Sequence, residues 1–261
     1  MNMPLYQVDA FTSKVFAGNP AAVCLLEKWP EEKMLQSIAA ENNLSETAFL
    51  VRKGSAVELC WFTPRAEVRL CGHATLAAAY VLFERKQWLQ ESIRFVTRYS
   101  GELTVSRKHD LFEMDFPAQP AQTATAVSGA AAALGVKAVE VLRSAEDLLV
   151  VLDTEKTVRE VNPDMAALAA IDCRGVIVTA RGEHSDFVSR FFAPRVGINE
   201  DPVTGSSHTV LAPYWAQKLG KNELRALQVS PRGGEIYCRH RGERVLISGR
   251  AVLYMEGVIT L

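Results

Sequence analysis

Length, composition and charge describe an ordinary globular protein: 261 residues, 48% hydrophobic and 23% charged, with 29 Lys and Arg against 30 Asp and Glu. A net charge of -1 excludes the broad basic surface of nucleic-acid-binding proteins, although a small local patch stays compatible with it. No apolar run reaches the roughly 18 residues of a membrane span, no signal-peptide pattern opens the chain, and the cysteines form no C-x-x-C pair, so we expect a cytoplasmic protein without a disulfide framework.

The first half of the chain predicts short strands and two helices. Residues 31–42 have apolar residues at helical spacing, and Asn42 or Asn43 is suited to end that helix in a left-handed conformation. A second helix, over residues 74–87, is apolar on every side at its start and must therefore be enclosed by other structure. Strands are expected at residues 6–11, 21–26, 46–52, 57–62, 93–97, 103–106 and 112–116.

A small, polar, proline-bearing segment at residues 117–125 divides the chain near its middle. We therefore expect an N-terminal lobe over residues 1–118 and a C-terminal lobe over residues 119–261, with the last strand free to return to the first lobe.

The second half predicts three helices and further strands. Ser128 is suited to cap a helix over residues 129–134, and Asn162 one that opens at Pro163. Residues 206–219 form a second all-round apolar helix, with Pro213 at a kink. Strands are expected at residues 175–179, 187–192, 225–229, 234–240, 244–249 and 251–255.

The approaches to the two apolar helices resemble each other. Phe62-Thr63-Pro64-Arg65 precedes the first and Phe192-Ala193-Pro194-Arg195 the second, and a glycine-containing loop follows in each case. This order indicates an internal duplication. The predicted fold class is α+β, with two pseudo-symmetric lobes, each a strongly curved mixed sheet wrapped around a central helix, and a site in the cleft between them.

Two features suggest chemistry, each with an ordinary structural alternative. The loops with Gly72 and Gly205 open helices, whose free N–H groups suit a carboxylate, or they simply make tight turns. Glu46 stands beside an apolar stretch, where desolvation favours acid/base work, or it begins a strand and points into water.

Several motifs together resemble the PhzF family of phenazine-biosynthesis-like isomerases. They cover nearly the whole chain in the family's order: Val8-Asp9-Ala10-Phe11-Thr12, Gly18-Asn19-Pro20, Ser45-Glu46-Thr47-Ala48-Phe49, Phe62-Thr63-Pro64, Cys71-Gly72-His73-Ala74-Thr75 and Asp201-Pro202-Val203-Thr204-Gly205. The resemblance implies the diaminopimelate-epimerase-like fold, often a homodimer, and a small carboxylate-bearing substrate.

The resemblance also implies roles for individual residues. Glu46 would be the general acid/base of a cofactor-free isomerase that moves a proton between carbons, with His73 and Asp201 assisting it. The backbones of Gly72, Gly205 and Ser206 would hold the substrate carboxylate, with Ser45 nearby. No cofactor or metal is expected.

Two other functions stay open. The first is an epimerase or racemase that uses Cys71, although the second half has Asp201-Pro202 where a paired thiol would stand. The second is a binding protein of the same fold without turnover. A metal site built from His73, His208, Cys71, Glu46 and Asp201 lacks the short ligand spacing of known motifs.

Overall fold

The computed structural model describes residues 2–123 and 129–261. The chain forms two compact units and passes from one to the other twice. Unit 1 comprises Met1–Asp115 and Ser248–Leu261, and unit 2 comprises Phe116–Ile247. The chain leaves unit 1 within β8 (Leu111–Pro117) and returns within β17 (Arg244–Gly249). The predicted helix cap Ser128 lies outside the described residues.

Unit 1 is a mixed sheet with one helix inside its curve and another on its outside. Its remaining strands are β1 (Asn2–Ala10), β2 (Asn19–Leu26), β3 (Glu46–Lys53), β4 (Ala56–Phe62), β5 (Glu67–Val68), β6 (Ser92–Thr97), β7 (Glu102–Lys108) and β18 (Ala251–Thr260). β18 pairs with β1 along its whole length, so the end of the chain is part of this unit. Helix α1 (Glu32–Asn42) packs on β3 and β4 and ends at Asn43, which has the expected positive φ of 50°.

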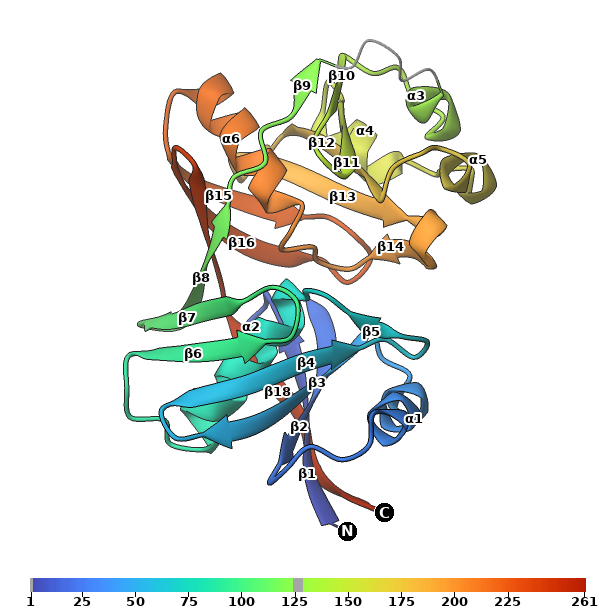
Figure 1. The fold of residues 1–261 in the computed structure, drawn as a ribbon. Coiled ribbons are helices and arrows are strands. Elements are labelled where there is room, and N and C mark those ends of the chain that lie inside the picture. The colour runs from blue at the N-terminus through green and yellow to red at the C-terminus, as the bar shows by residue number, and fades with distance from the viewer. Residues whose placement is uncertain (1, 124–128) are drawn as a thin grey trace. The chain divides into compact units, whose positions relative to one another are not determined.

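Helix α2 (Gly72–Tyr80) is the central helix of unit 1 and continues as a π-helical turn, η1 (Val81–Arg85). It packs against β1, β2, β3 and β18 (Figure 1). Every side chain from His73 to Ala79 is buried. Four alanines among its nine residues let the strands approach closely on all sides. The helix enclosed by strands is therefore confirmed.

Unit 2 has the same kind of sheet. Its strands are β9 (Gln122–Thr123), β10 (Glu140–Arg143), β11 (Asp147–Val151), β12 (Gly175–Arg181), β13 (Phe187–Ala193), β14 (Ile198–Asp201), β15 (Glu223–Gln228) and β16 (Gly234–Arg241), besides β17. Its helices are α3 (Ala130–Ala133), α4 (Glu155–Glu160), α5 (Met165–Ala169), the 3-10 turn η2 (Pro194–Val196) and α6 (His208–Leu219). Helix α6 packs against β15 and β16 (Figure 1). Its buried side chains include Val210, Leu211 and Trp215.

The strand pairings of unit 1 recur in unit 2 in the same order. The β1–β2 antiparallel, β2–β3 parallel and β3–β4 antiparallel pairs correspond to β10–β11, β11–β12 and β12–β13. After the next short strand and the buried helix, β4–β6 parallel and β6–β7 antiparallel correspond to β13–β15 and β15–β16. This repetition confirms the duplication and the predicted α+β fold class.

The structure also departs from the sequence-based expectations in unit 2. Strand β11 was not predicted, because its residues from Asp147 to Val151 are all buried and show no alternation that would distinguish a strand. The helix expected to open at Asn162 instead begins later, as α5, and Asp164 caps it by accepting a hydrogen bond from the Ala167 N–H at 3.0 Å.

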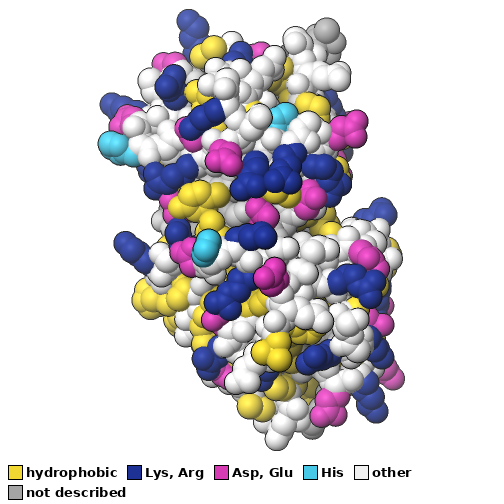
Figure 2. All heavy atoms as spheres, turned by 90° about the vertical axis from the view of Figure 1, so that its left-hand side faces the viewer, with side chains coloured by type: hydrophobic (Ala, Val, Ile, Leu, Met, Phe, Trp, Pro, Cys, Tyr) yellow, Lys and Arg dark blue, Asp and Glu magenta, His cyan; other side chains and the backbone are white. Residues whose placement is uncertain are grey.

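Figure 2 shows one face of the molecule, on which acidic and basic side chains are interspersed. This distribution agrees with the nearly neutral composition of the chain. Among the described residues, no helix combines the length and apolar character that crossing a membrane requires.

Candidate active site

Glu46 is the first residue of β3 and a buried carboxylate. Its residue exposure is 7%, so the alternative that it points into water is wrong. The parallel pairing of β2 and β3 places Ala21 opposite Glu46, which brings the start of β2 beside the start of β3. The carboxylate therefore stands at one end of the sheet, where loops and a helix start also converge.

His73, in the first turn of α2, lies against this carboxylate. Its Nε2 atom is 3.1 Å from Oε2 of Glu46, and both side chains are about nine-tenths buried, with 7% and 10% exposed. The Oε2 atom has no other hydrogen-bond partner among the described residues. Two ionisable groups in this contact share a desolvated environment in which a proton can pass between them.

Cys71 completes the cluster in unit 1. It occupies the N-cap position of α2, and its Sγ atom lies 3.5 Å from Nδ1 and 4.0 Å from Nε2 of His73. Thr75 holds the backbone of Cys71 from within the helix, because its N–H and its hydroxyl both donate to the Cys71 carbonyl. Among the described residues no side-chain cap hydrogen bond forms at the N-terminus of α2, where helix-start amide groups suit an anion.

Asn19 contacts the other ring nitrogen of His73. Its side-chain Nδ2 atom is 3.2 Å from Nδ1 of His73, and the residue is fully buried. The preceding Gly18 has a φ of +68°, and a Cβ there would meet the carbonyl oxygen of Ala10 at 2.2 Å. Only glycine fits that turn, and the turn delivers Asn19 to the ring.

Burial and neighbouring charge shift the acid/base properties of the cluster. Desolvation raises the pKa of the Cys71 thiol to about 11, so the thiol is protonated near neutral pH. Desolvation by itself lowers the pKa of His73, but the neighbouring Cys71 and Glu46 outweigh it and raise that pKa well above its ordinary value. Since the thiol is neutral near pH 7, the Glu46 carboxylate is the partner that favours protonated His73 there.

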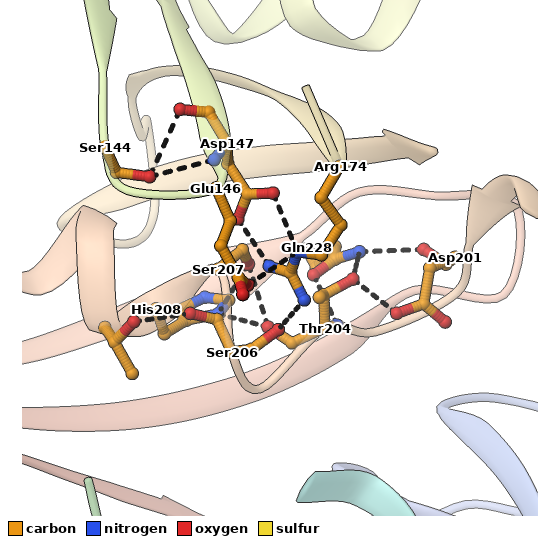
Figure 3. A network of polar contacts seen from close by, with 11 residues as sticks. Ser144, Glu146, Asp147, Arg174, Asp201, Thr204, Ser206, Ser207, His208 and Gln228 are labelled. Carbon is orange, nitrogen blue, oxygen red and sulfur yellow. Dashed lines mark hydrogen bonds and ion pairs between the residues drawn. The ribbon is translucent and has the colours of Figure 1, made fainter. Parts of the chain in front are cut away.

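In unit 2, Asp201 at the end of β14 is held by a loop network that Figure 3 shows. The Thr204 hydroxyl donates to Oδ2 of Asp201 at 2.5 Å. Gln228, buried at the end of β15, accepts the Thr204 N–H at 2.8 Å and donates through Nε2 to the Asp201 carbonyl at 2.8 Å. One amide side chain therefore connects both ends of the Asp201–Thr204 turn.

Arg174 attaches the next part of the same loop to the sheet (Figure 3). Its guanidinium binds the buried carboxylate of Asp147 through two hydrogen bonds, and its Nη1 atom donates to Oγ of Ser206 at 3.2 Å. Burial raises the pKa of Asp147 although Arg174 opposes the shift, so this carboxylate depends on the arginine to stay ionised. This hydrogen bond fixes Ser206 in the turn that precedes α6.

The other predicted site residues occupy loops and helix starts. Ser45 is half-buried in the turn between α1 and β3, and Gly72 is the half-buried first residue of α2. Helix α6 begins two residues later than expected, since Gly205 and Ser206 belong to the turn that precedes His208. His208 itself is fully buried, with Nδ1 2.8 Å from the Thr204 carbonyl, so it is a structural residue of unit 2.

Sequence reasoning gave no site role to Asn19, Gln228, Arg174 or Asp147. Asn19 stands in the Gly18-Asn19-Pro20 motif, and that motif was the signal for it. The other three residues belong to no motif and reach the loop only through strand pairing, as when Gln228 pairs with Ser189. No local pattern points to them.

The duplicated fold, with a central helix enclosed by strands in each unit, defines a class of protein, that of the diaminopimelate-epimerase-like fold. The comparisons agree at the level of the fold: a hydroxyproline epimerase from Agrobacterium vitis superposes with a TM-score of 0.64 at 11% identity, covering 99% of this chain and 91% of the epimerase. At that identity the likeness shows the fold alone.

The particular family follows from closer matches. The sequence model of the phenazine biosynthesis-like protein family, PhzC-PhzF, matches residues 8–257, and the chain belongs to this family. An uncharacterized isomerase of Pseudomonas aeruginosa is 54% identical over 261 residues, which cover 100% of both chains. The crystal structure of a PhzF family protein from Enterococcus faecalis has a TM-score of 0.97 at 48% identity, again with 100% coverage of both chains.

Proposed function

We propose that this protein is an isomerase that moves a proton between two carbons of a small carboxylate-bearing substrate, with Glu46 as the acid/base. The Glu46 carboxylate takes the proton from one carbon, and the electron pair of that C–H bond passes into the conjugated system of the substrate. The resulting carboxylic acid returns the proton to a second carbon, which restores the carboxylate. The reaction is balanced without an oxidant, a reductant or a resident cofactor.

The observation that carries the proposal is the contact between Glu46 and His73. The buried Glu46 carboxylate has one oxygen whose sole polar contact among the described residues is His73, which leaves that oxygen able to receive a proton from a substrate. His73, 3.1 Å away, stabilises the carboxylate before proton transfer and can hold a proton during it. The name of the 54% identical relative, an isomerase, supports the same reaction class.

Asp201, Ser206 and the helix-start amides are assigned substrate contacts in this proposal. Thr204 and Gln228 hold Asp201, and Arg174 holds Ser206, so both side chains are oriented before a ligand binds. Amides at the starts of α2 and α6 suit a carboxylate. These contacts are predictions. For Asp201 the test is Asp201→Asn, which we expect to lose turnover.

The alternative of a Cys71-dependent epimerase receives less support. The thiol does contact His73, but burial raises the pKa of Cys71 to about 11, and the protonated thiol is not a base. We therefore expect Cys71→Ser to retain proton transfer, while an inactive Cys71→Ser enzyme that folds normally would favour the epimerase.

The experiment is exchange in deuterated water. Candidate cyclic amino and hydroxy acids are incubated with the protein, and label incorporation at carbon is followed by NMR. Wild type and the surface control Glu27→Gln should incorporate label, and Glu46→Gln should lose at least about 100-fold in rate. Equal incorporation by wild type and Glu46→Gln would refute the role of Glu46. Tight binding of a candidate acid without exchange would point to a binding protein.

A further inference from the structure

We propose that Glu46, Cys71 and His73 also form a binding site for a thiophilic divalent cation such as Zn²⁺, which inhibits the protein when it binds. One ligand atom from each of these buried residues lies within 4.8 Å of the others. No other group of this kind occurs in the residues that the structure describes. The inhibition rests on the function proposed above, whereas the binding does not.

The distances fit a single ion. A tetrahedral zinc centre with metal–ligand distances of about 2.0–2.3 Å separates neighbouring ligand atoms by roughly 3.3–3.8 Å. Nε2 of His73 lies 3.1 Å from Oε2 of Glu46 and 4.0 Å from Sγ of Cys71, on either side of that range. Small side-chain rotations therefore bring the three atoms around one centre.

The chemistry of the ligand set selects the kind of ion. Thiolate and imidazole favour Zn²⁺ and similar borderline ions over Mg²⁺ or Ca²⁺, which prefer all-oxygen sites. A bound cation removes the thiol proton even where burial has made that proton hard to remove. Three protein ligands leave a fourth position open, as in zinc sites that also bind a small molecule.

The surroundings prepare the cluster for a positive ion. The Oε2 atom of Glu46 is buried, and Nε2 of His73 is its one polar contact among the described residues, so a cation would give this oxygen a further partner. Cys71 and His73 are fixed at the rigid start of α2, where Thr75 holds the Cys71 carbonyl. The side chains of His73 and Glu46 keep 7% and 10% exposure, which gives an aqueous ion a way in.

Asn19 supplies the outer contact that a metal-bound histidine needs. A histidine that binds metal through Nε2 carries its proton on Nδ1 and donates it to an acceptor. The Asn19 amide is the neighbour of Nδ1, and turning the amide over presents its oxygen there. Metal binding thus requires a change in side-chain orientation but no movement of the backbone.

The test is direct metal binding to the intact, phosphine-reduced protein. Competition of Zn²⁺ with a chromogenic chelator measures the affinity, and Co²⁺ reports the ligands through its sulfur-to-metal charge-transfer band. We expect one ion per chain, bound at about 1 µM or tighter, with the band present. Cys71→Ser should abolish the band, and both Cys71→Ser and His73→Gln should weaken binding at least about tenfold.

Matched controls separate this site from other cysteines and histidines of unit 1. Cys60→Ser changes a buried thiol and His109→Gln an exposed imidazole, and both should keep the affinity and the band. A missing band, binding unchanged in Cys71→Ser, or equal weakening in Cys60→Ser would overturn the proposal. Circular dichroism checks that each variant folds. If Cys71→Ser fails to fold, the proposal is tested by two other results: the charge-transfer band of the wild type and the metal affinity of Glu46→Gln, which should be lower than that of the wild type.

The metal-binding experiment and the exchange experiment can fail independently, so failure of the metal site is distinguishable from failure of the proposed function. A charge-transfer band combined with unchanged exchange in Glu46→Gln would keep the metal site and refute the catalytic role. Exchange that depends on Glu46, without any band, would do the reverse. If both hold, Zn²⁺ should suppress exchange in wild type and much less in Cys71→Ser.

Discussion

The side-chain amide of Asn19 lies 3.2 Å from Nδ1 of His73, while Nε2 of the same ring faces Glu46 at 3.1 Å. In the neutral ring, with Nδ2 of Asn19 donating, Nδ1 is the acceptor and the ring proton sits on Nε2, directed at the carboxylate. Asn19 thereby favours the neutral tautomer that can exchange a proton with Glu46.

Replacing Asn19 should change the protonation of His73 before it changes the fold. Asn19→Ala removes the donor, and we expect turnover to fall roughly three- to tenfold, from the ~0.5–1.5 kcal/mol of one hydrogen bond. Asn19→Asp presents an acceptor and should move the proton to Nδ1 and raise the pKa of His73. Nitrogen-15 NMR of the imidazole distinguishes the tautomers. An unchanged tautomer in Asn19→Asp would contradict this selection.

Cys71 should react slowly with alkylating agents at neutral pH. Because burial raises the pKa of Cys71 to about 11, the thiolate fraction rises about tenfold per pH unit throughout the neutral and mildly alkaline range. The rate of iodoacetamide labelling, followed by mass spectrometry of the peptide, should keep climbing above pH 9. The unfolded protein provides the control, since its thiols level off near their ordinary pKa. Early levelling in the folded protein would be inconsistent with the buried thiol.

Gln228 should contribute to stability and to the orientation of Asp201. Gln228→Ala leaves the Thr204 N–H and the Asp201 carbonyl without this partner in a buried place, at a cost of about 1–3 kcal/mol in the free energy of unfolding. Urea denaturation measures that cost, and Gln217→Ala, at an exposed position of α6, is the matched control. If Gln228→Ala and Gln217→Ala have equal free energies of unfolding, the hydrogen bonds of Gln228 do not contribute to stability.

His208 should make stability depend on pH in the mildly acidic range. Burial lowers the pKa of His208 from 6.5 to about 4, so the unfolded chain binds more protons than the folded chain between those values. The contribution is fully present above pH 6.5 and is lost as pH falls toward 4, by on the order of 3 kcal/mol. Chemical denaturation of wild type and His208→Gln across this range isolates the difference. Parallel stability curves for the two proteins would exclude His208 as the source.

Local sequence patterns predicted the parts of this protein that depend on neighbours along the chain. The end of α1 at Asn43, the enclosed helix, expected from residue 74 and found from Gly72, and the repeat of F-x-P-R before each central helix were all readable from the sequence. They were readable because helix periodicity, left-handed caps and repeated motifs are short-range properties. The fully buried strand β11 had no such pattern and was missed.

Tertiary structure alone decided which side chains meet. The sequence determined that Glu46 and His73 belong to family motifs, but their 3.1 Å contact depends on a parallel pairing of β2 with β3 and on a helix enclosed by strands. Gln228 reaches Thr204 only because β15 runs parallel to β13. These contacts join residues 24 or more positions apart, and strand register, which no local pattern encodes, determines them.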